Sequence, residues 1–554
     1  MPLTPYTGPF GRPELLHLLR RTLFGVAPAD LAHFNGMTLQ QVVDELLTFS
    51  TVVPPPVKAY SVDDGNGNMD PALIDVPVTY GTTWVNTPRD PNEVFPDPAT
   101  SRMISFVEWW SGLMVQQDRN LREKMVLFWH NTLVTQISVA FLPEANYQYC
   151  KILRDQSKGN FRQMMYDMTI NPAMLYYLNG YLNNSFAPDE NYARELMELF
   201  TLGEGSGYSE ADVQQAARVL TGWTIAVEQG GNPIVPSTIY YNFLHDTGSK
   251  QFSSFFNNTV IPGDASPNGG VTELNALLDM LFLQEAVSKH ICRELYRFFV
   301  HSDIDAIIET DVIEPLAQIF RDNSADPEQI RIVMNALLTS DRFFSTEVRG
   351  CMVKSPIDYT YGMVRQLGMP FPSGGQLEAQ YSTWFDVRNI AAYAGQSLAD
   401  PPNVAGWPAY YQFPQYDTMW MDAANYALRK LISDIICYVG LTTPANTYEP
   451  QSANLSFKID FAAFVAQFQN PLDPNTLIDE AAELLFATPL SQVVKDQLKT
   501  NFLLFGQASD IYWMQGWAAY SADPNTTDPY GMLVPVILLS LFLDMQSAAE
   551  YHLH

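Results

Sequence analysis

Acidic and basic side chains gather on one face of the predicted helix in PDENYARELMELFTLG. Asn191, Arg194, Glu195 and Glu198 follow the spacing i, i+3, i+4, i+7, which places the four side chains together. Two carboxylates three residues apart can share a metal ion or divide the roles of general acid and general base. The alternative is a solvent-exposed face on which Arg194 forms ion pairs with Glu190 and Glu198.

Two other segments carry histidines that could join this chemistry. His130 lies in LREKMVLFWHNTLVT, near the end of a helix that is predicted to be buried. His245, Asp246 and Lys250 lie in FLHDTGSK, which puts an imidazole, a carboxylate and an ammonium into one short turn. A histidine in a buried helix also serves as a core or cap residue, and HDTGSK is also an ordinary polar turn. The sequence leaves both interpretations open.

The first functional hypothesis is an enzyme whose site draws on all three segments. Its candidate groups are His130, Glu195, Glu198, His245 and Asp246, with Arg194 or Lys250 stabilising negative charge. The mixed ligand set His130, His245, Glu195 and Glu198 suits Zn, Fe or Mn, whereas a harder ion would use the carboxylates alone. The expected chemistry is hydrolysis or oxidation at a bound metal, or acid–base catalysis.

A further candidate site lies in SVDDGNGNMDPALID. Asp64, Asn66, Asn68 and Asp70 occupy alternate positions, which is the oxygen-ligand rhythm of a calcium loop. Met69 stands where the sharp turn of such a loop favours glycine, and an aspartate stands where a bidentate glutamate is usual. An ordinary polar turn is the alternative.

The second functional hypothesis is a non-catalytic binding or assembly protein. Two loops rich in proline and aromatic residues, 51–103 and 395–420, would contact a polysaccharide or a protein partner. Their aromatic side chains are Trp84, Trp407, Tyr410, Tyr411, Tyr416 and Trp420. The polar signature would then be a buried structural network, in which Arg194 pairs with a glutamate and His130 caps a helix.

The elements that must position these residues are mostly helices. Apolar residues recur at helical spacing over 14–24, 39–47, 106–117, 121–135, 144–156, 160–169, 189–202, 209–220, 271–300, 305–322, 328–338 and 355–367. Residues 222–268 are rich in glycine, asparagine and aromatic residues and contain short β-branched pieces that predict a small β-hairpin. We therefore expect a mainly α fold of two packed helical lobes, 1–345 with a loop insertion at 51–103, and 346–554.

Composition excludes some classes of function. Sixty Asp and Glu residues against 31 Lys and Arg give a net charge of −29, so general binding of the nucleic-acid backbone is not expected. The longest apolar run, 532–543, is too short for a membrane span, which needs about 20 residues. The four cysteines, Cys150, Cys292, Cys351 and Cys437, form no CxxC pair. No apolar stretch typical of a cleaved signal precedes or follows Arg20-Arg21, so the protein is expected in the cytoplasm or exported folded with a partner.

Several strings resemble one known family. NYARELMELFTLGEGSGYSEADVQQAARVLTGWT, MVLFWHN, HDTGSK and PPNVAGWP are similar to the bacterial family known as domain of unknown function 1800. LLHLLRRTLFG and KSPIDYTYGMVRQLG resemble its opening and a later segment, so the resemblance runs over nearly the whole chain. It assigns to the family pattern His130, Asn131, Asn191, Arg194, Glu195, Glu198, Asp212, Arg218, Trp223, His245, Asp246, Lys250, Gly406 and Trp407. It implies no established reaction.

The same resemblance implies a partner. Members of that family often occur beside a sulfatase-like family, domain of unknown function 1501, many of whose members carry twin-arginine signals. By this analogy the protein would act with, and leave the cell with, a sulfatase-like protein.

Overall fold

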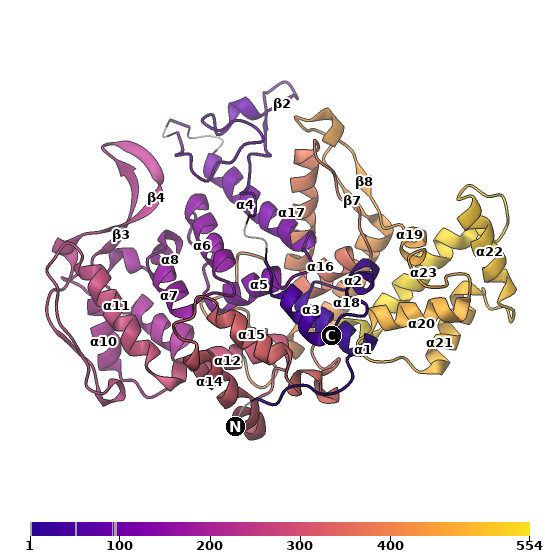
Figure 1. Ribbon diagram of the computed structural model, residues 1–554. Coiled ribbons are helices and arrows are strands. Elements are labelled where there is room, and N and C mark those ends of the chain that lie inside the picture. Colours follow the sequence, from indigo (N-terminus) through magenta and orange to yellow (C-terminus); the bar gives the residue numbers. More distant parts are fainter. Residues whose placement is uncertain (1–2, 50–51, 91, 94–96) are drawn as a thin grey trace.

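Helices make up most of the structure, a computed structural model that describes residues 3–49, 52–90, 92–93 and 97–554 (Figure 1). The first helices are α1 (Arg12–Thr22), α2 (Pro28–Phe34), α3 (Leu39–Leu46), α4 (Pro98–Val115), α5 (Arg122–Thr132), α6 (Pro143–Asp155), α7 (Phe161–Thr169) and α8 (Pro172–Tyr177). Next come α9 (Asn191–Glu195), the π-helix η3 (Leu196–Thr201), α10 (Glu210–Val219), α11 (Gly269–Phe282), α12 (Glu285–Phe299), α13 (Ala306–Ile308), α14 (Glu314–Asp322) and α15 (Gln329–Leu338). The mainly α prediction is confirmed.

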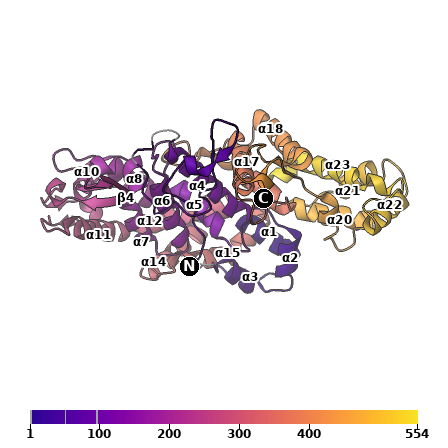
Figure 2. The ribbon, with the colours of Figure 1, turned by 90° about the horizontal axis from the view of Figure 1, so that it is seen from above.

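The C-terminal part continues in the same way. Its helices are α16 (Pro356–Gln366), α17 (Leu377–Tyr393), α18 (Ala423–Asp434), α19 (Phe461–Val465), α20 (Pro474–Leu485), α21 (Gln492–Leu498), α22 (Ile511–Ala522) and α23 (Val534–Ser547). Helices α20–α23 lie at one end of an elongated molecule, and α10 and α11 lie at the other (Figures 1 and 2).

Short antiparallel hairpins supply the β structure. The pairs are β1 (Val62–Asp63) with β2 (Met69–Asp70), β3 (Trp223–Gln229) with β4 (Asn232–Tyr240), β5 (Lys250–Gln251) with β6 (Val260–Ile261), and β7 (Leu441–Thr442) with β8 (Ser456–Phe457). The β3–β4 pair turns at Gly230-Gly231 and aligns Trp223 with Tyr240. This is the hairpin that the glycine-rich segment predicts, because two adjacent glycines suit a tight turn at positive φ.

Local sequence signals explain several helix starts. Ser209 and Asp212 form a reciprocal capping box at the start of α10, and the side chain of Asn160 accepts the backbone N–H of Gln163 at the start of α7. Helix α4 begins at Pro98, eight residues before the predicted start at 106. The cause is the cap at Asp97, whose carboxylate accepts the Ala99 N–H at 2.9 Å.

The N-terminal helix joins the two ends of the chain. Figures 1 and 2 place α1 between the helices of the N-terminal half and α20. Leu15, Leu16, Leu18 and Leu19 of α1 are buried in a hydrophobic core that extends from this helix to Tyr551. No helix within the described residues is both long enough and apolar enough to cross a membrane. The division into lobes 1–345 and 346–554 stays a prediction.

Candidate functional site

Arg194, the central residue of the signature helix, is tied by ion pairs to two glutamates. Its guanidinium donates to Glu190 at 3.0 Å within the same helix and to Glu210 at the start of α10 at 2.9 Å. Arg194 thus uses the Glu190 pair expected for a solvent face, and it pairs with Glu210 rather than with Glu198. The contact fixes α9 against α10.

Glu195 and Glu198 are half-buried and have no hydrogen-bond partner of their own among the described residues. Burial raises the pKa of Glu195, the charge of Glu198 raises it further, and Arg194 opposes both. Burial raises the pKa of the Tyr177 and Tyr208 hydroxyl groups, and the charge of Glu195 adds to this effect. The helix changes to π geometry at Leu196, between the two glutamates, and such insertions are frequent at functional sites.

His130 is sealed inside the N-terminal half. Its side chain lies between the rings of Trp110 and Trp407, and its Nδ1 lies 2.8 Å from the hydroxyl of Tyr149. Tyr149 donates its own proton to the Leu133 carbonyl at 2.7 Å, so His130 must donate from Nδ1. Burial lowers the pKa of His130 to about 3, which keeps the ring neutral.

His245 and Lys250 share a buried carboxylate, Glu273 of α11. His245 Nε2 lies 3.0 Å from Oε1 of Glu273, and the Lys250 ammonium pairs with Oε2. His245 Nδ1 lies 2.9 Å from the Thr221 carbonyl, so both ring nitrogens face oxygen atoms. All three side chains are almost fully buried. The Glu273 carboxylate, shared by Lys250 and His245, joins the 245–250 turn to α11.

Asp246 forms a second ion pair beside this cluster. Its two carboxylate oxygens accept from Arg218 of α10 at 2.7 and 3.1 Å. Burial raises the pKa of Asp246, but the Arg218 hydrogen bond and the Gly248 N–H outweigh it, so the net pKa is below its usual range. The bidentate geometry holds the turn against α10.

The predicted catalytic residues therefore lie in three clusters. Among the described residues, His130 bonds within the α5–α6 region, His245, Asp246 and Lys250 bond to α10 and α11, and Arg194 bonds to α10. The part of the chain that the structure describes contains no group of three or more His, Cys, Asp or Glu side chains arranged to hold a metal ion. The joint metal site at His130, His245, Glu195 and Glu198 stays a prediction.

The predicted calcium loop forms the turn between β1 and β2. Asp64 accepts the backbone N–H groups of Asn66 at 2.8 Å and of Asn68 at 3.2 Å, as well as the Asn68 side-chain amide. Asp70 accepts the Ala72 N–H at 2.8 Å and begins a short helical turn. These contacts are those of a polar turn.

The aromatic loops are buried rather than displayed. Trp84, Trp407, Trp420 and Tyr416 are less than a tenth exposed, whereas Tyr411 keeps an exposed ring. The expectation that these residues present a broad aromatic contact surface is wrong for the first four. Their rings are large enough to fill the core where long loops cross the helices.

The PPNVAGWP loop docks directly on the helix that carries His130. The backbone N–H of Trp407 donates to the Asn131 side chain at 2.9 Å. Gly406 has φ +87°, and a Cβ there would lie 2.4 Å from Asn131 Oδ1. Asn131, Gly406 and Trp407 are thus parts of one contact, which explains why two distant motifs share the family pattern.

A pair of carboxyl groups that the motifs did not reveal lies between α4 and α17. Glu108 and Asp386 are both half-buried and face each other across these helices without a cation beside them among the described residues. Burial and the charge of Asp386 raise the pKa of Glu108 to about 8, and burial raises that of Asp386 to about 6. No sequence motif predicts this pair, because residues 377–393 were not predicted as a helix.

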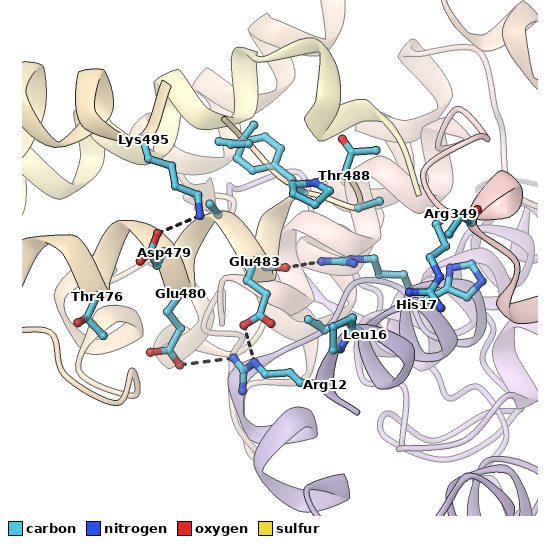
Figure 3. A pocket seen from close by; sticks show the side chains of 18 of the residues that line it. Arg12, Leu16, His17, Arg349, Thr476, Asp479, Glu480, Glu483, Thr488 and Lys495 are labelled. Atoms are coloured by element: carbon cyan, nitrogen blue, oxygen red, sulfur yellow. Dashed lines mark hydrogen bonds and ion pairs between the residues drawn. The ribbon is translucent and has the colours of Figure 1, made fainter. Parts of the chain in front are cut away.

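A large groove lies between the N-terminal helix and the C-terminal helices (Figure 3). It has a volume of about 810 Å³, within the range of about 300–1,000 Å³ that is typical of ligand sites. Apolar side chains lining it are Pro13, Leu16, Ala482, Phe486, Ala487, Pro489 and Leu490. No sequence motif predicts the groove, because its two main walls, from α1 and from residues 469–495, are more than 400 residues apart in the chain.

Charged side chains of both signs line the same groove. Arg12 of α1 pairs with Glu483 of α20 at 2.5 Å and reaches Glu480 at 3.7 Å, and Lys495 of α21 pairs with Asp479 at 2.9 Å (Figure 3). Four cations, the three arginines Arg12, Arg20 and Arg349 and the lysine, face three carboxylates here. The groove is therefore far less acidic than the chain as a whole.

Comparison with known proteins bears on the identity of the chain. No curated protein and no solved structure matches it. One family model matches residues 17–517, which is most of the chain. The chain therefore belongs to the family described as protein of unknown function DUF1800.

Proposed function

We propose that the protein is a non-catalytic binding protein that seats a peptide segment of a partner protein in the groove between α1 and α20–α21. The groove supports this proposal, because it combines the volume of a ligand site with an apolar lining. Its ionisable side chains pair with one another across the walls. Side chains held in such ion pairs are better suited to recognising a ligand than to transferring a proton.

The chemistry of the lining favours a peptide over a sugar polymer. Phe486 is the one Phe, Tyr or Trp among the described residues that line the groove, so stacking platforms are scarce. The leucines and prolines accommodate apolar side chains, and the paired ions can exchange partners with charges of either sign. A segment with alternating apolar and charged residues satisfies both.

The signature residues would act as the frame of this binding protein. The Arg194–Glu210, Arg218–Asp246 and Lys250–Glu273 pairs join α9, α10, α11 and the 245–250 turn. The Lys250–Glu273 pair is buried, whereas the other two pairs are partly exposed. A buried and fully paired polar group helps to specify one arrangement of helices. A structural role therefore accounts for these contacts without a shared site.

The resemblance supplies the partner to test, a sulfatase-like protein of the domain-of-unknown-function-1501 family. Titration calorimetry of the two purified proteins measures the Kd. We expect saturable binding and at least a tenfold loss of affinity in Thr488→Trp, because Thr488 lines the groove and an indole there fills it.

Thr527→Trp is the matched control, because Thr527 is exposed in the loop after α22. It should bind like the wild type. No measurable binding to the sulfatase-like protein overturns that partner, whereas equal binding by both tryptophan variants overturns the groove as the seat.

A second function, acid–base catalysis, is favoured by one observation. Glu195 is a half-buried carboxyl whose pKa is raised by burial and by Glu198, as suits a general acid. A panel of chromogenic ester, phosphate and glycoside substrates, assayed from pH 5 to pH 8, tests it. Activity that disappears in Glu195→Gln and persists in the exposed variant Glu204→Gln supports catalysis here. Equal activity of both variants excludes this residue.

A further inference from the structure

The four cysteines have different surroundings. Cys150, Cys292 and Cys437 are buried, and burial raises the pKa of each thiol, in Cys437 to about 12. Cys351, in the turn after α15, is only half-buried. Three inert thiols thus accompany one that solvent can reach.

Cys351 lies beside two cationic side chains. Its Sγ is 3.4 Å from Nη2 of Arg21 in α1, and the imidazole of His301, just after α12, is near enough to lower the pKa of the same sulfur. The Asp303 N–H donates to Nδ1 of His301 at 3.0 Å, which leaves Nε2 to carry the ring proton. Two backbone carbonyls favour the protonated thiol, that of Val348 at 3.3 Å from Sγ and that of Val300 at 4.0 Å.

The surroundings of Arg21 also favour a negative charge on Cys351. Its side chain is buried, with 2% of its surface exposed, and its Nε has no hydrogen-bond partner among the described residues. Its other contacts are the Met352 sulfur and the Val348 carbonyl, and within the described chain no carboxylate lies at ion-pair distance. A buried guanidinium without a counter-ion is costly. An ionised Cys351 would supply that counter-ion.

The balance of effects favours ionisation. Partial burial raises the pKa of the Cys351 thiol, but the His301 hydrogen bond and the charges of Arg21 and His301 outweigh it, so the pKa lies below its usual range. The pKa of His301 is raised chiefly by its hydrogen bond to Cys351. Tyr296 and Arg342 complete the ionisable surroundings.

We propose that Cys351 is a reactive thiolate held by Arg21 and His301, and that it is a site of covalent modification by thiol–disulfide exchange. The sulfur anion attacks one sulfur of a low-molecular-weight disulfide R–S–S–R. A Cys351–S–S–R bond forms, the R–S–S–R bond breaks, and R–S⁻ leaves with the electron pair. The disulfide is the oxidant of the Cys351 sulfur, so no further oxidant is needed. Attack by an external thiol reverses the step.

Alkylation by iodoacetamide, followed by peptide mass spectrometry at each cysteine, measures the ionisation. The ratio of the rate at pH 7 to the rate at pH 10 removes differences in access, because every exposed thiol is ionised at pH 10. We expect the ratio for Cys351 in the folded protein to be several-fold higher than in the urea-unfolded chain. Oxidised glutathione should form a mixed disulfide at Cys351 and leave the three buried cysteines unmodified.

Variants separate a held thiolate from a merely accessible thiol. His301→Gln and Arg21→Met should each lower the pH 7 to pH 10 ratio several-fold, and Arg21→Lys should restore most of it by keeping the charge. Circular dichroism checks folding, and His301→Gln carries the test if Arg21→Met does not fold. A folded-state ratio no higher than in the unfolded chain, or unchanged in His301→Gln, overturns the proposal. Exclusive glutathionylation elsewhere overturns it as well.

Discussion

Several polar residues of the signature are held by hydrogen bonds or ion pairs, whereas Glu195 and Glu198 have no such side-chain partner among the described residues. His130 donates to Tyr149, His245 and Lys250 share Glu273, and Asp246 binds Arg218. The buried carboxylate of Glu273 is costly to remove, because its loss leaves the Lys250 ammonium without its counter-ion in a region of low dielectric. The stability of proteins with single substitutions therefore tests the structural role of the signature most directly.

Glu273→Gln tests that role. The amide cannot neutralise Lys250, so the free energy of unfolding should fall by about 3 kcal/mol in urea titrations at pH 7. Asp155→Asn is the control, because Asp155 pairs with Lys151 on an exposed helix surface. It should cost less than about 0.5 kcal/mol. A loss no larger in Glu273→Gln than in the control would contradict a structural network.

Glu108 predicts a pH dependence of stability. Its pKa is about 8 in the folded protein and near 4.5 in the unfolded chain, so the folded state binds more protons between these values. Stability should be fully present below about pH 4.5 and should fall as the pH rises toward 8. Gln cannot ionise. At pH 9 the free energy of unfolding of Glu108→Gln, measured in urea, should therefore exceed that of the wild type by about 2 kcal/mol.

The control for this pH effect is Glu550→Gln, at an exposed position. It should follow the wild-type profile between pH 5 and pH 9. A Glu108→Gln protein whose stability still declines with the wild-type slope would show that another group causes the decline.

At the scale of elements, most helices follow from periodicity and caps, and the exceptions have identifiable causes. The prediction over 209–220 agrees with α10 because a capping box and a regular apolar stripe coincide there. Helix α17 was not predicted, because polar residues interrupt the apolar periodicity of residues 377–393. The three polar clusters could not be separated from sequence, because pairing with Glu210 and Glu273 depends on tertiary contacts.

The contact of the PPNVAGWP loop with α5 predicts different stabilities for two glycine substitutions. Gly406→Ala should destabilise the protein by about 2 kcal/mol more than Gly395→Ala, because the new methyl group meets Asn131. Both glycines have positive φ, but no atom lies within 4 Å of a Cβ at Gly395, so the backbone strain is matched. Thermal unfolding of the two variants measures the difference. Equal melting temperatures would mean that the loop moves away without cost.

The whole molecule is joined by its first helix. Arg12 and Arg20 of α1 bind Glu483 of α20 through its carboxylate and its carbonyl, and Arg349 binds Glu14. Because α1 is also buried in the core of the N-terminal half, the two ends of the chain share one packing unit. The groove exists only where these parts meet.

This arrangement predicts cooperative unfolding. The wild-type protein should give a single endotherm in differential scanning calorimetry, because neither end keeps its core without α1. The double variant Arg12→Ala/Arg20→Ala removes the contacts to Glu483 and should separate the endotherm into two. Two endotherms in the wild type would instead mean that the two packed lobes predicted from the sequence, 1–345 and 346–554, unfold separately.

The groove wall formed by residues 469–495 lies outside every motif that carries the family resemblance. The family model spans this wall, but its side chains contribute neither to the signature pairs nor to the loop contact at Asn131. On the proposed function, substitutions in the wall would therefore change what the groove binds without disturbing those contacts. Exchanging this segment between family members should transfer their choice of partner onto a common scaffold. The family would then resemble a set of adaptors, alike in frame and distinct in what each one holds.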